Sequence, residues 1–359
     1  MSMETLDEML VSSWYNARSS VPSSYIQPPE CRPGNLAAAS SEAIPVIDLG
    51  GHDRADIVRH VLKASEEYGF FQVVNHGVSK DLMDETVSIY KEFHAMSGKE
   101  KIEECSKDPN GSCKLYTSSQ NHKRDAIQYW KDSLTHPCPP SGDFIQYWPH
   151  KPTNYREVVG KYTRELRKLG LKILELLCEG LGLNPGYFSG DLSENPMILV
   201  HHYPPCPDPS LTLGLAKHRD PTLITILLQE EHVQGLQVVK DGQWIGVEPI
   251  PNAFVVNIGL ILQIISNGRL IGAEHRVVTN SSTSRTSVSY FVYPSNESII
   301  EPAKVLVNGS STPTYRSMTC AEFRGNFFSK GPKVYFDPRI KCQADFGSLS
   351  KILRIKVVS

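Results

Sequence analysis

The chain has 359 residues, with 37 Lys and Arg against 39 Asp and Glu, for a formal net charge of −2. This balance, with no block of like charges, excludes nucleic acid as a main partner, because phosphate binding needs clustered Lys and Arg. No apolar run approaches the roughly 20 residues that cross a bilayer, and the N-terminus shows no signal-peptide pattern. We therefore expect a soluble cytoplasmic protein without a membrane partner.

The cysteines are scattered and contain no C-x-x-C pair. In the cytoplasm such residues are typically reduced thiols buried in the core, so neither disulfides nor a zinc site is expected. The eight are Cys31, Cys105, Cys113, Cys138, Cys178, Cys206, Cys320 and Cys342.

Composition divides the chain into three regions. Residues 1–43 are rich in Ser, Pro and Ala, which predicts a loosely ordered arm with room for one short helix. Residues 44–195 mix strand and helix patterns and form an expected α/β support region. Residues 196–359 are predicted to form a β core with a C-terminal helix. We expect one catalytic unit and not two independent domains.

The support region alternates apolar runs with helical periodicity. Residues 155–183 place apolar side chains at steps of three and four, which predicts a long amphipathic helix ended by glycine. Residues 107–119 are rich in Gly, Ser and Asn and are expected to form a loop. The other predicted elements are strands at 44–49 and 70–76 and helices at 54–68 and 80–96.

After Pro196 the pattern changes to short β-branched and aromatic runs spaced about ten residues apart. Such spacing is typical of a double-sheet barrel of the jelly-roll type. Asp241-Gly242 separates two of these runs and predicts a tight hairpin. A helical pattern returns at 319–329. The predicted fold is therefore mainly β, a double-stranded β-helix supported by helices from both ends of the chain.

Three residues of the barrel region could bind one divalent metal. His218 and Asp220 lie two residues apart, and His275 follows 57 residues later. Two imidazoles and one carboxylate leave coordination positions open, as non-haem Fe(II) requires, whereas structural zinc prefers a closed shell. The chain has 12 histidines, so this spacing alone also allows a chance combination.

Arg285 and Ser287 strengthen the metal interpretation. They lie on one face of a predicted strand that begins ten residues after His275. The guanidinium fork matches a carboxylate, and the hydroxyl adds a donor. A dicarboxylate could thus be held at its far end while its near end chelates iron. The alternative is an arginine on a solvated strand edge.

The chain resembles the plant iron(II) and 2-oxoglutarate-dependent dioxygenases from Ile44 to about Phe328. The segment YWKDSLTH and the phrase VVNIGL resemble most the branch that contains hyoscyamine 6-hydroxylase. The motifs that carry the resemblance are IPVIDL, EEYGFFQVVNHGV, PPCP, KHRDPTLITILLQ, DGQWIGVEPIPNAFVVNIG, HRVV and RTSVSYF.

The resemblance implies Fe(II), 2-oxoglutarate and O2, with ascorbate as a supportive reductant, and a small-molecule substrate from specialised metabolism such as an alkaloid. His218, Asp220 and His275 match the iron ligands. Arg285 and Ser287 match the 2-oxoglutarate clamp, and Tyr203 matches the tyrosine that helps seat the co-substrate.

Three positions depart from common members of the family, although none removes a ligand. His201 stands where many have Asn, and Leu260 where many have Asp after the glycine of NIG. Ala273-Glu274 replaces a serine-containing phrase before His275 and could alter the orientation of that imidazole.

The reaction expected from the resemblance is hydroxylation of a C–H bond, with decarboxylation of 2-oxoglutarate to succinate. The carboxylate of Asp220 argues against halogenation, because halogenating relatives have a small residue there. Desaturation, epoxidation and ring formation stay open as alternatives, as does a barrel that binds a small molecule without turnover. We expect a monomer.

Four aromatic residues are candidates for the substrate pocket: Tyr116, Tyr129, Phe291 and Phe327. The run TSSQNHKR after Tyr116 has no carboxylate before Asp125, so a cationic alkaloid would lack a local counter-ion and a neutral terpenoid or phenolic stays open. Other polar and aromatic residues are interpreted as structural: the Asn75-His76-Gly77 turn, His202, His232, and core packing by the pair Phe327-Phe328.

Overall fold

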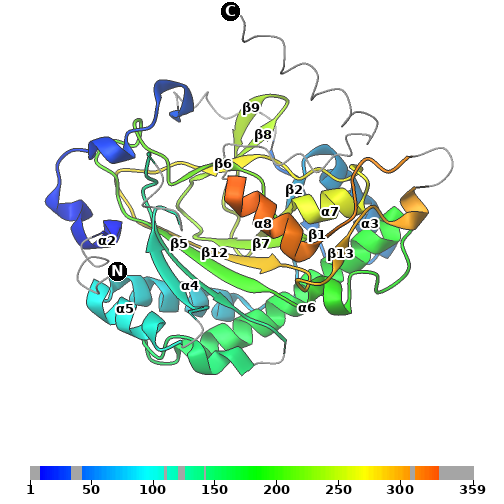
Figure 1. Cartoon of the computed structure of the whole chain (residues 1–359), viewed down its shortest axis with the longest axis horizontal. Coiled ribbons are helices and arrows are strands. Elements are labelled where there is room, and N and C mark those ends of the chain that lie inside the picture. The colour runs from blue at the N-terminus through cyan, green and yellow to red at the C-terminus, as the bar shows by residue number, and fades with distance from the viewer. Residues whose placement is uncertain are drawn as a thin grey trace, which may run out of the picture.

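A computed structural model describes residues 9–33, 43–108, 111–119, 126–140, 143–307 and 312–330. Two β-sheets dominate it, with helices on the outside (Figure 1). The larger sheet has the order β1-β2-β10-β7-β12-β5-β4-β3, and the smaller has the order β6-β11-β8-β9. The expected mainly β jelly roll with flanking helices is confirmed.

The eight-stranded sheet mixes strands from early and late in the chain. Four of its strands, β1 to β4, come from before residue 195, and the other four come from after it. One continuous sheet therefore crosses the boundary at residue 195, and the division of the chain at residues 43 and 195 stays a prediction. In spatial order the strands are β1 (Val46–Asp48), β2 (Phe70–Val74), β10 (Phe254–Ile258), β7 (Ile224–Gln229), β12 (Arg285–Val292), β5 (Met197–Tyr203), β4 (Asp132–Pro137) and β3 (Lys114–Thr117).

The four-stranded sheet carries the predicted hairpin. Asp241 and Gly242 join β8 to β9 with φ of 49° and 78°, the left-handed backbone that a tight two-residue hairpin needs. The strands are β6 (Leu215–His218), β11 (His275–Val277), β8 (Leu236–Lys240) and β9 (Gln243–Gly246), while β13 (Ile299–Ile300) pairs separately with β14 (Met318–Thr319).

Helices cover the outer side of the larger sheet. The longest, α6 (Tyr155–Leu181), confirms the predicted amphipathic helix and ends at Gly182, whose φ of 70° forms a left-handed C-cap. The other α-helices are α2 (Val11–Trp14), α3 (Arg54–Glu67), α4 (Lys80–Ala95), α5 (Gly98–Ser106), α7 (Leu260–Ile265) and α8 (Cys320–Lys330). The single-turn 3₁₀ segments are η1 (Tyr15–Ala17), η2 (Ser23–Tyr25), η3 (Pro29–Cys31), η4 (Asp143–Tyr147), η5 (Gly190–Ser193) and η6 (Lys304–Leu306).

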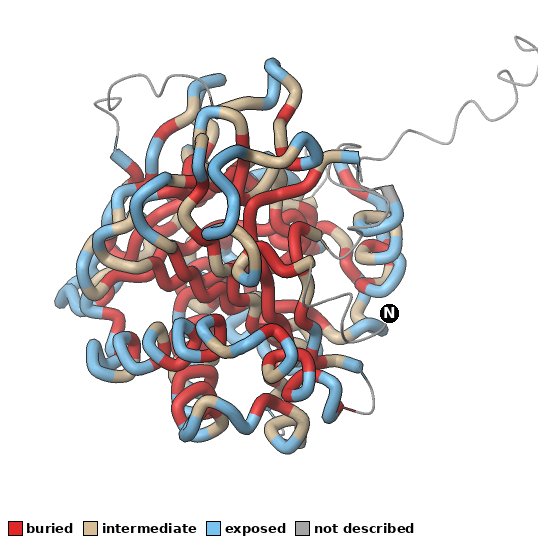
Figure 2. The backbone as a smooth tube through the Cα atoms, turned by 90° about the vertical axis from the view of Figure 1, so that its left-hand side faces the viewer, coloured by how far each residue is buried: buried red, intermediate tan, exposed pale blue. Residues whose placement is uncertain are grey.

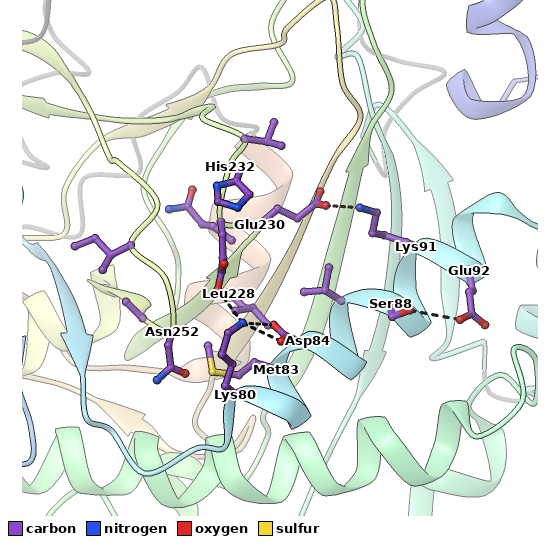
Figure 3. Close-up of a pocket in the computed structure, with 16 residues that line it drawn as sticks. Lys80, Met83, Asp84, Ser88, Lys91, Glu92, Leu228, Glu230, His232 and Asn252 are labelled. Atoms are coloured by element: carbon purple, nitrogen blue, oxygen red, sulfur yellow. Dashed lines mark hydrogen bonds and ion pairs between the residues drawn. The ribbon is translucent and has the colours of Figure 1, made fainter.

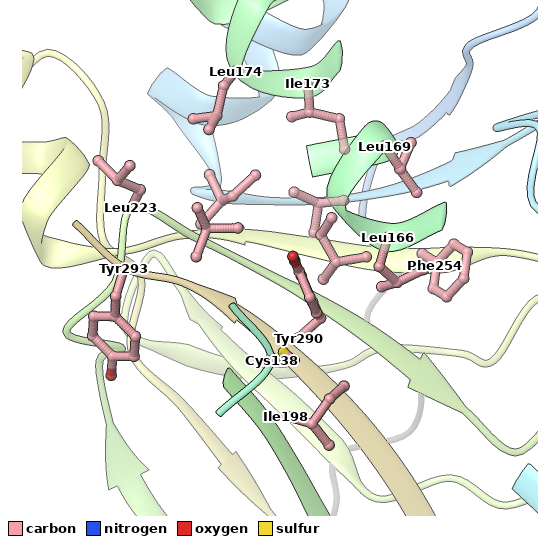
Figure 4. Close-up of a cluster of buried hydrophobic side chains, with 14 of the residues drawn as sticks. Cys138, Leu166, Leu169, Ile173, Leu174, Ile198, Leu223, Phe254, Tyr290 and Tyr293 are labelled. Atoms are coloured by element: carbon pink, nitrogen blue, oxygen red, sulfur yellow. The ribbon is translucent and has the colours of Figure 1, made fainter. Parts of the chain in front are cut away.

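The two faces of the larger sheet differ in what they pack against. On the outer face, side chains such as Ile198 and Tyr290 belong to the same main hydrophobic core as Leu166 and Ile173 of α6 (Figure 4). The inner face meets the smaller sheet through a second apolar cluster that includes Val238. Figure 2 shows the buried strands at the centre and the exposed residues on the surrounding helices and loops.

The expected loop at 107–119 contains a strand. Residues 114–117 form β3, which pairs antiparallel with β4 and closes one edge of the larger sheet. Pairing with a neighbouring strand here overrides the loop-forming tendency of the surrounding Gly and Ser. Just before it, α5 begins with a capping box in which Ser97 and Glu100 bond reciprocally.

The described part of the N-terminal arm is packed and not loosely held. Val11 and Tyr25 are buried in a cluster with Trp130. Asp132 of β4 accepts hydrogen bonds from the backbone N–H groups of Val11 and Ser12 at 2.9 and 2.8 Å. A few long-range contacts fix this segment, and no short-range periodicity in its sequence announces them.

Phe328 also differs from the expected core packing, because it is exposed on α8.

None of the helices in the described residues is long and apolar enough to span a bilayer.

Candidate active site

Two neighbouring strands of the smaller sheet bring the predicted metal ligands together. His218 ends β6 and pairs with His275, the first residue of β11. Asp220 follows two residues after His218, with its Oδ1 3.4 Å from His218 Nε2 and 3.6 Å from His275 Nε2. One ligand atom from each residue lies within 4.8 Å of the others. One ion could therefore contact all three.

Backbone carbonyls orient both imidazoles. His218 Nδ1 lies 2.9 Å from the Ala216 carbonyl, and His275 Nδ1 lies 3.2 Å from the Ala273 carbonyl. A carbonyl can only accept, so Nδ1 carries the proton and the Nε2 lone pair faces Asp220. The departure at Ala273 therefore leaves this contact intact, since a main-chain oxygen makes it.

Asp220 is held by two residues that the sequence interpretation missed. Its Oδ2 accepts from Thr225 Oγ1 at 2.6 Å and from Asn257 Nδ2 at 2.8 Å. Thr225 and Asn257 lie opposite each other in β7 and β10. Their only signal in the sequence is a polar residue inside each of two apolar strands.

Burial and neighbouring charge set the protonation of Asp220 and His275. Burial alone would raise the pKa of Asp220, but the nearby imidazoles of His275 and His218 and the hydrogen bonds to the carboxylate keep it below its ordinary value. Burial, with repulsion from His218, lowers the pKa of His275 to about 4. At neutral pH Asp220 is therefore a carboxylate and His275 a neutral imidazole, the forms that bind metals.

The donor set fits Fe(II). Two nitrogens and one oxygen on one side of an ion leave other coordination positions for exogenous ligands, whereas a structural zinc site would use four protein ligands. Asp220 and His275 are buried and His218 is partly exposed. Phe70 packs edge-on to His275 with 5.1 Å between ring centroids, which places an apolar wall beside the site.

Arg285 opens β12 near the centre of the larger sheet, so the solvated-edge alternative does not apply. Only 1% of Arg285 is exposed. Its Nη2 donates to Gln229 Oε1 at 2.9 Å, and its guanidinium carbon lies 5.3 Å from the centroid of the Tyr203 ring. Burial lowers the pKa of Arg285 from its usual value, but the side chain stays charged at neutral pH.

Several polar atoms around Arg285 are buried without a hydrogen-bond partner in the described residues: Arg285 Nε and Nη1, and Tyr203 Oη. Buried donors are almost always satisfied, so this set marks a place for an anionic acceptor. The distal carboxylate of 2-oxoglutarate fits this chemistry.

Ser287 and His201 lie next to this cluster. Both are buried and occupy opposite positions in β12 and β5. His201 Nδ1 lies 2.8 Å from Ser133 Oγ of β4. His201, which stands where many family members have Asn, thus connects the site to β4 through its side chain. Leu260, the third departure, is a buried core residue whose backbone N–H donates to the Asp220 carbonyl at 2.8 Å.

The four pocket candidates lie in different surroundings. Tyr116 of β3 is half-buried and opposite Ser133, and Phe291 shares the alternating face of β12 with Arg285 and Ser287. Tyr129 is buried just before β4, and Phe327 is partly buried against the main core from α8.

The residues interpreted as structural take structural positions. His76 lies in a turn between positive-φ residues and contacts the Asn252 carbonyl at 3.1 Å. His202 faces away from the site and stacks on His94. His232 lines a surface cleft of about 580 Å³ between α4 and residues 228–233, where ion pairs such as Lys91–Glu230 cross (Figure 3). None of the three metal-ligand candidates lines this cleft.

Comparison with known families agrees with this geometry. Residues 194–294 match the 2OG-Fe(II) oxygenase superfamily, and residues 44–155 match the N-terminal region described as non-haem dioxygenase in morphine synthesis. The chain belongs to the 2-oxoglutarate and Fe(II)-dependent oxygenases and is a 2-oxoglutarate-dependent dioxygenase.

Individual relatives cover nearly the whole chain. Hyoscyamine 6-dioxygenase of Hyoscyamus niger is 42% identical over 92% of this chain and 97% of its own length. Protein DOWNY MILDEW RESISTANCE 6 of Arabidopsis thaliana is 41% identical over 89% of this chain and 95% of its own length. A crystal structure of JOX2 in complex with 2OG, Fe and JA superposes with a TM-score of 0.79 at 36% identity, covering 91% of this chain and 93% of that chain.

Proposed function

We propose that this enzyme hydroxylates a C–H bond of a small plant metabolite, with His218, Asp220 and His275 as the iron ligands and Arg285 as the anchor of 2-oxoglutarate. The observation that carries the proposal is the pairing of an open three-ligand cluster with a buried arginine whose remaining donors lack partners.

The two sheets would bind different ligands. The two imidazoles and Asp220 would hold Fe(II) from one side, and Thr225 and Asn257 would fix the carboxylate. Arg285, Ser287 and Tyr203 would hold the distal carboxylate of 2-oxoglutarate from the larger sheet. Gln229 keeps the guanidinium in position by accepting from Nη2.

When bound, Fe(II) and 2-oxoglutarate supply the oxidant: O2 places one oxygen atom in succinate, which forms with CO2, and the other in the substrate. The protein contributes orientation, because the fixed co-substrate and the C–H bond of the substrate must meet the same side of the ion. The buried surroundings of Asp220 and His275 also limit the access of water.

This proposal allows an alkaloid, a terpenoid or a phenolic as the substrate. The proposed pocket residues are Tyr116, Tyr129, Phe291 and Phe327.

We also propose a cytoplasmic monomer. The seven cysteines of the described residues are all free thiols, which suits a reducing compartment. Size-exclusion chromatography with light scattering tests the monomer, and imaging of a tagged chain tests its location.

The test of the function is incubation with Fe(II), 2-oxoglutarate, ascorbate and fractions of a plant metabolite extract under air. The expected result is substrate-dependent succinate and a product that gains one oxygen. A product that loses two hydrogens would indicate desaturation or ring formation instead. Stoichiometric binding of a metabolite without succinate above background would contradict the enzyme and favour a binding protein.

A further inference from the structure

A buried lysine lies on the inner face of the larger sheet, next to the proposed site. Lys131 immediately precedes β4 and is only 2% exposed. Its Nζ donates to Ser133 Oγ at 3.0 Å. Ser133 lies opposite His201, and His201 lies opposite Ser287. Lys131 is therefore on the same side of the sheet as the 2-oxoglutarate clamp.

The ammonium of Lys131 has an incomplete set of partners. It offers three donors, and in the described residues it makes the hydrogen bond to Ser133 and lies 5.5 Å from the centroid of the Tyr116 ring. The neighbouring acid is Asp132, whose two carboxylate oxygens accept from the backbone of Val11 and Ser12. Among the ion pairs found in the described residues, none includes Lys131.

The N-terminal arm packs against Trp130, the residue that precedes Lys131. Trp130, beside Lys131, packs against Trp14 and Tyr25 of the arm with ring centroids 5.4 and 5.3 Å apart. This cluster lies at the start of β4. Burial lowers the pKa of Lys131 to about 7, although the charge of Asp132 opposes the shift. A buried ammonium without a paired anion is costly, so its presence needs a reason.

Lys131 connects to the reaction site through His201. Ser133 Oγ lies 2.8 Å from His201 Nδ1. The His201 ring lies 5.9 Å from Tyr203, whose ring lies under the Arg285 guanidinium. In the described residues, the inner face of the larger sheet thus carries two buried basic side chains, Lys131 and Arg285. Arg285 would take the co-substrate, which leaves Lys131 for another anion.

We propose that Lys131 is a specificity-determining residue that binds the carboxylate of an organic-acid substrate, with Tyr116 packed beside the bound group. The inference rests on the proposed function and narrows its substrate class. A carboxylate would pair with the buried ammonium and fill its remaining donors. A substrate with a cationic amine would meet like charge at this position and is disfavoured.

The test uses the full chain with Fe(II) and saturating 2-oxoglutarate under nitrogen, so that binding is measured without turnover. The probes are aryl-propenoic acids and bicyclic terpenoid acids, each with its matched carboxamide and primary amine, titrated by calorimetry. We expect the acids to bind about tenfold or more tightly than their carboxamides, as a charged hydrogen bond in a buried site implies.

Variants separate Lys131 from its surroundings. Lys131→Met should remove the preference for the acids, and Lys131→Arg should keep part of it. The matched control is Lys114→Met, an exposed lysine on β3, which should leave the preference unchanged. Lys131→Met should unfold at the same temperature as the wild type or higher, because it removes a buried charge.

Three results would overturn the proposal: carboxamides or amines that bind as well as the acids, no binding of any acid, or a preference that survives Lys131→Met. Binding of 2-oxoglutarate separates this failure from failure of the proposed function. A wild-type chain that does not bind 2-oxoglutarate contradicts the function itself. If Lys131→Met loses 2-oxoglutarate while the acids show no preference, Lys131 belongs to the co-substrate site and the proposal is wrong.

Discussion

The two faces of the larger sheet are built from the same strands but do different work. On β5, Val200 faces the helices and is fully buried, whereas the next residue, His201, faces the smaller sheet. On β12, Tyr290 joins the main core while Arg285 and Ser287 lie on the other face. Because side chains alternate along a strand, neighbouring residues belong to separate functions.

The comparison teaches where the stability of the protein and its chemistry reside. The outer face buries apolar side chains against α6 and contributes hydrophobic free energy. The inner face buries charged and polar groups, which cost folding free energy unless they are paired. Substitutions on the two faces should therefore separate activity from stability.

The largest expected effect is on the inner side of the barrel. Asp220→Ala should reduce succinate formation to background, a loss of about 10³-fold or more, because it removes a proposed ligand and the partner of Asn257. The far-ultraviolet circular dichroism and unfolding temperature should stay close to wild type. Asp84→Ala, on the surface of α4, is the control, and full turnover by Asp220→Ala would refute the assignment.

On the outer face, Ile173→Ala should cost about 2–5 kcal/mol of unfolding free energy, because it leaves a cavity between α6 and the sheet. Ile173 is fully buried in the main core. Urea denaturation measures the loss, and the folded variant should keep the wild-type KM for 2-oxoglutarate. Lys168→Ala, whose side chain is 73% exposed, should change little; equal losses for both variants would contradict the division between the faces.

Arg285→Lys should weaken 2-oxoglutarate binding by about 10- to 100-fold, since a point charge replaces a fork that can make two hydrogen bonds. The Fe(II) affinity should change far less, because Arg285 is not a proposed ligand. Titration of 2-oxoglutarate under nitrogen measures its affinity for Arg285→Lys and for the wild type. The exposed Arg269→Lys is the control. Wild-type affinity in Arg285→Lys would show that the anchor lies elsewhere.

The smallest expected effect is a pH dependence of stability from His136 of β4. Burial lowers the pKa of His136 to about 4, so between pH 6.5 and 4 the unfolded chain binds a proton that the folded chain does not. Stability should therefore fall as the pH drops through this window, by up to about 1.4 kcal/mol per pH unit from this residue.

His136→Gln should remove part of that slope, because glutamine does not titrate but can still bond the Tyr155 hydroxyl that His136 contacts at 2.9 Å. Urea denaturation at several pH values measures the slope, and the exposed His60→Gln should leave it unchanged. An unaltered slope in His136→Gln would show that this histidine is already protonated in the folded protein.

Elements that depend on short-range sequence patterns could be predicted. The spacing of apolar residues predicted α6, and Asp241-Gly242 predicted the hairpin, because both follow from short-range backbone preferences. The metal-ligand candidates could be named because His218 and Asp220 lie two residues apart in the sequence and His275 lies on a recognisable strand.

Features made by long-range pairing could not be predicted in this way. β3 pairs with β4, which follows it after a connecting segment, and the arm packs against Trp130, more than a hundred residues away in the sequence. The roles of Thr225 and Asn257 depend on the register between β7 and β10. Lys131 lies in the segment YWKDSLTH, but its proposed role rests on its burial and on its lack of an ion pair in the described residues, which the sequence does not show.

The most direct test of the central claim is a crystal structure of the chain grown without oxygen, with Fe(II) and 2-oxoglutarate present. The claim predicts one ion bound by His218 Nε2, His275 Nε2 and a carboxylate oxygen of Asp220, with the distal carboxylate of the keto acid on Arg285 and Tyr203. An ion held by other residues, or a keto acid bound away from Arg285, would contradict it.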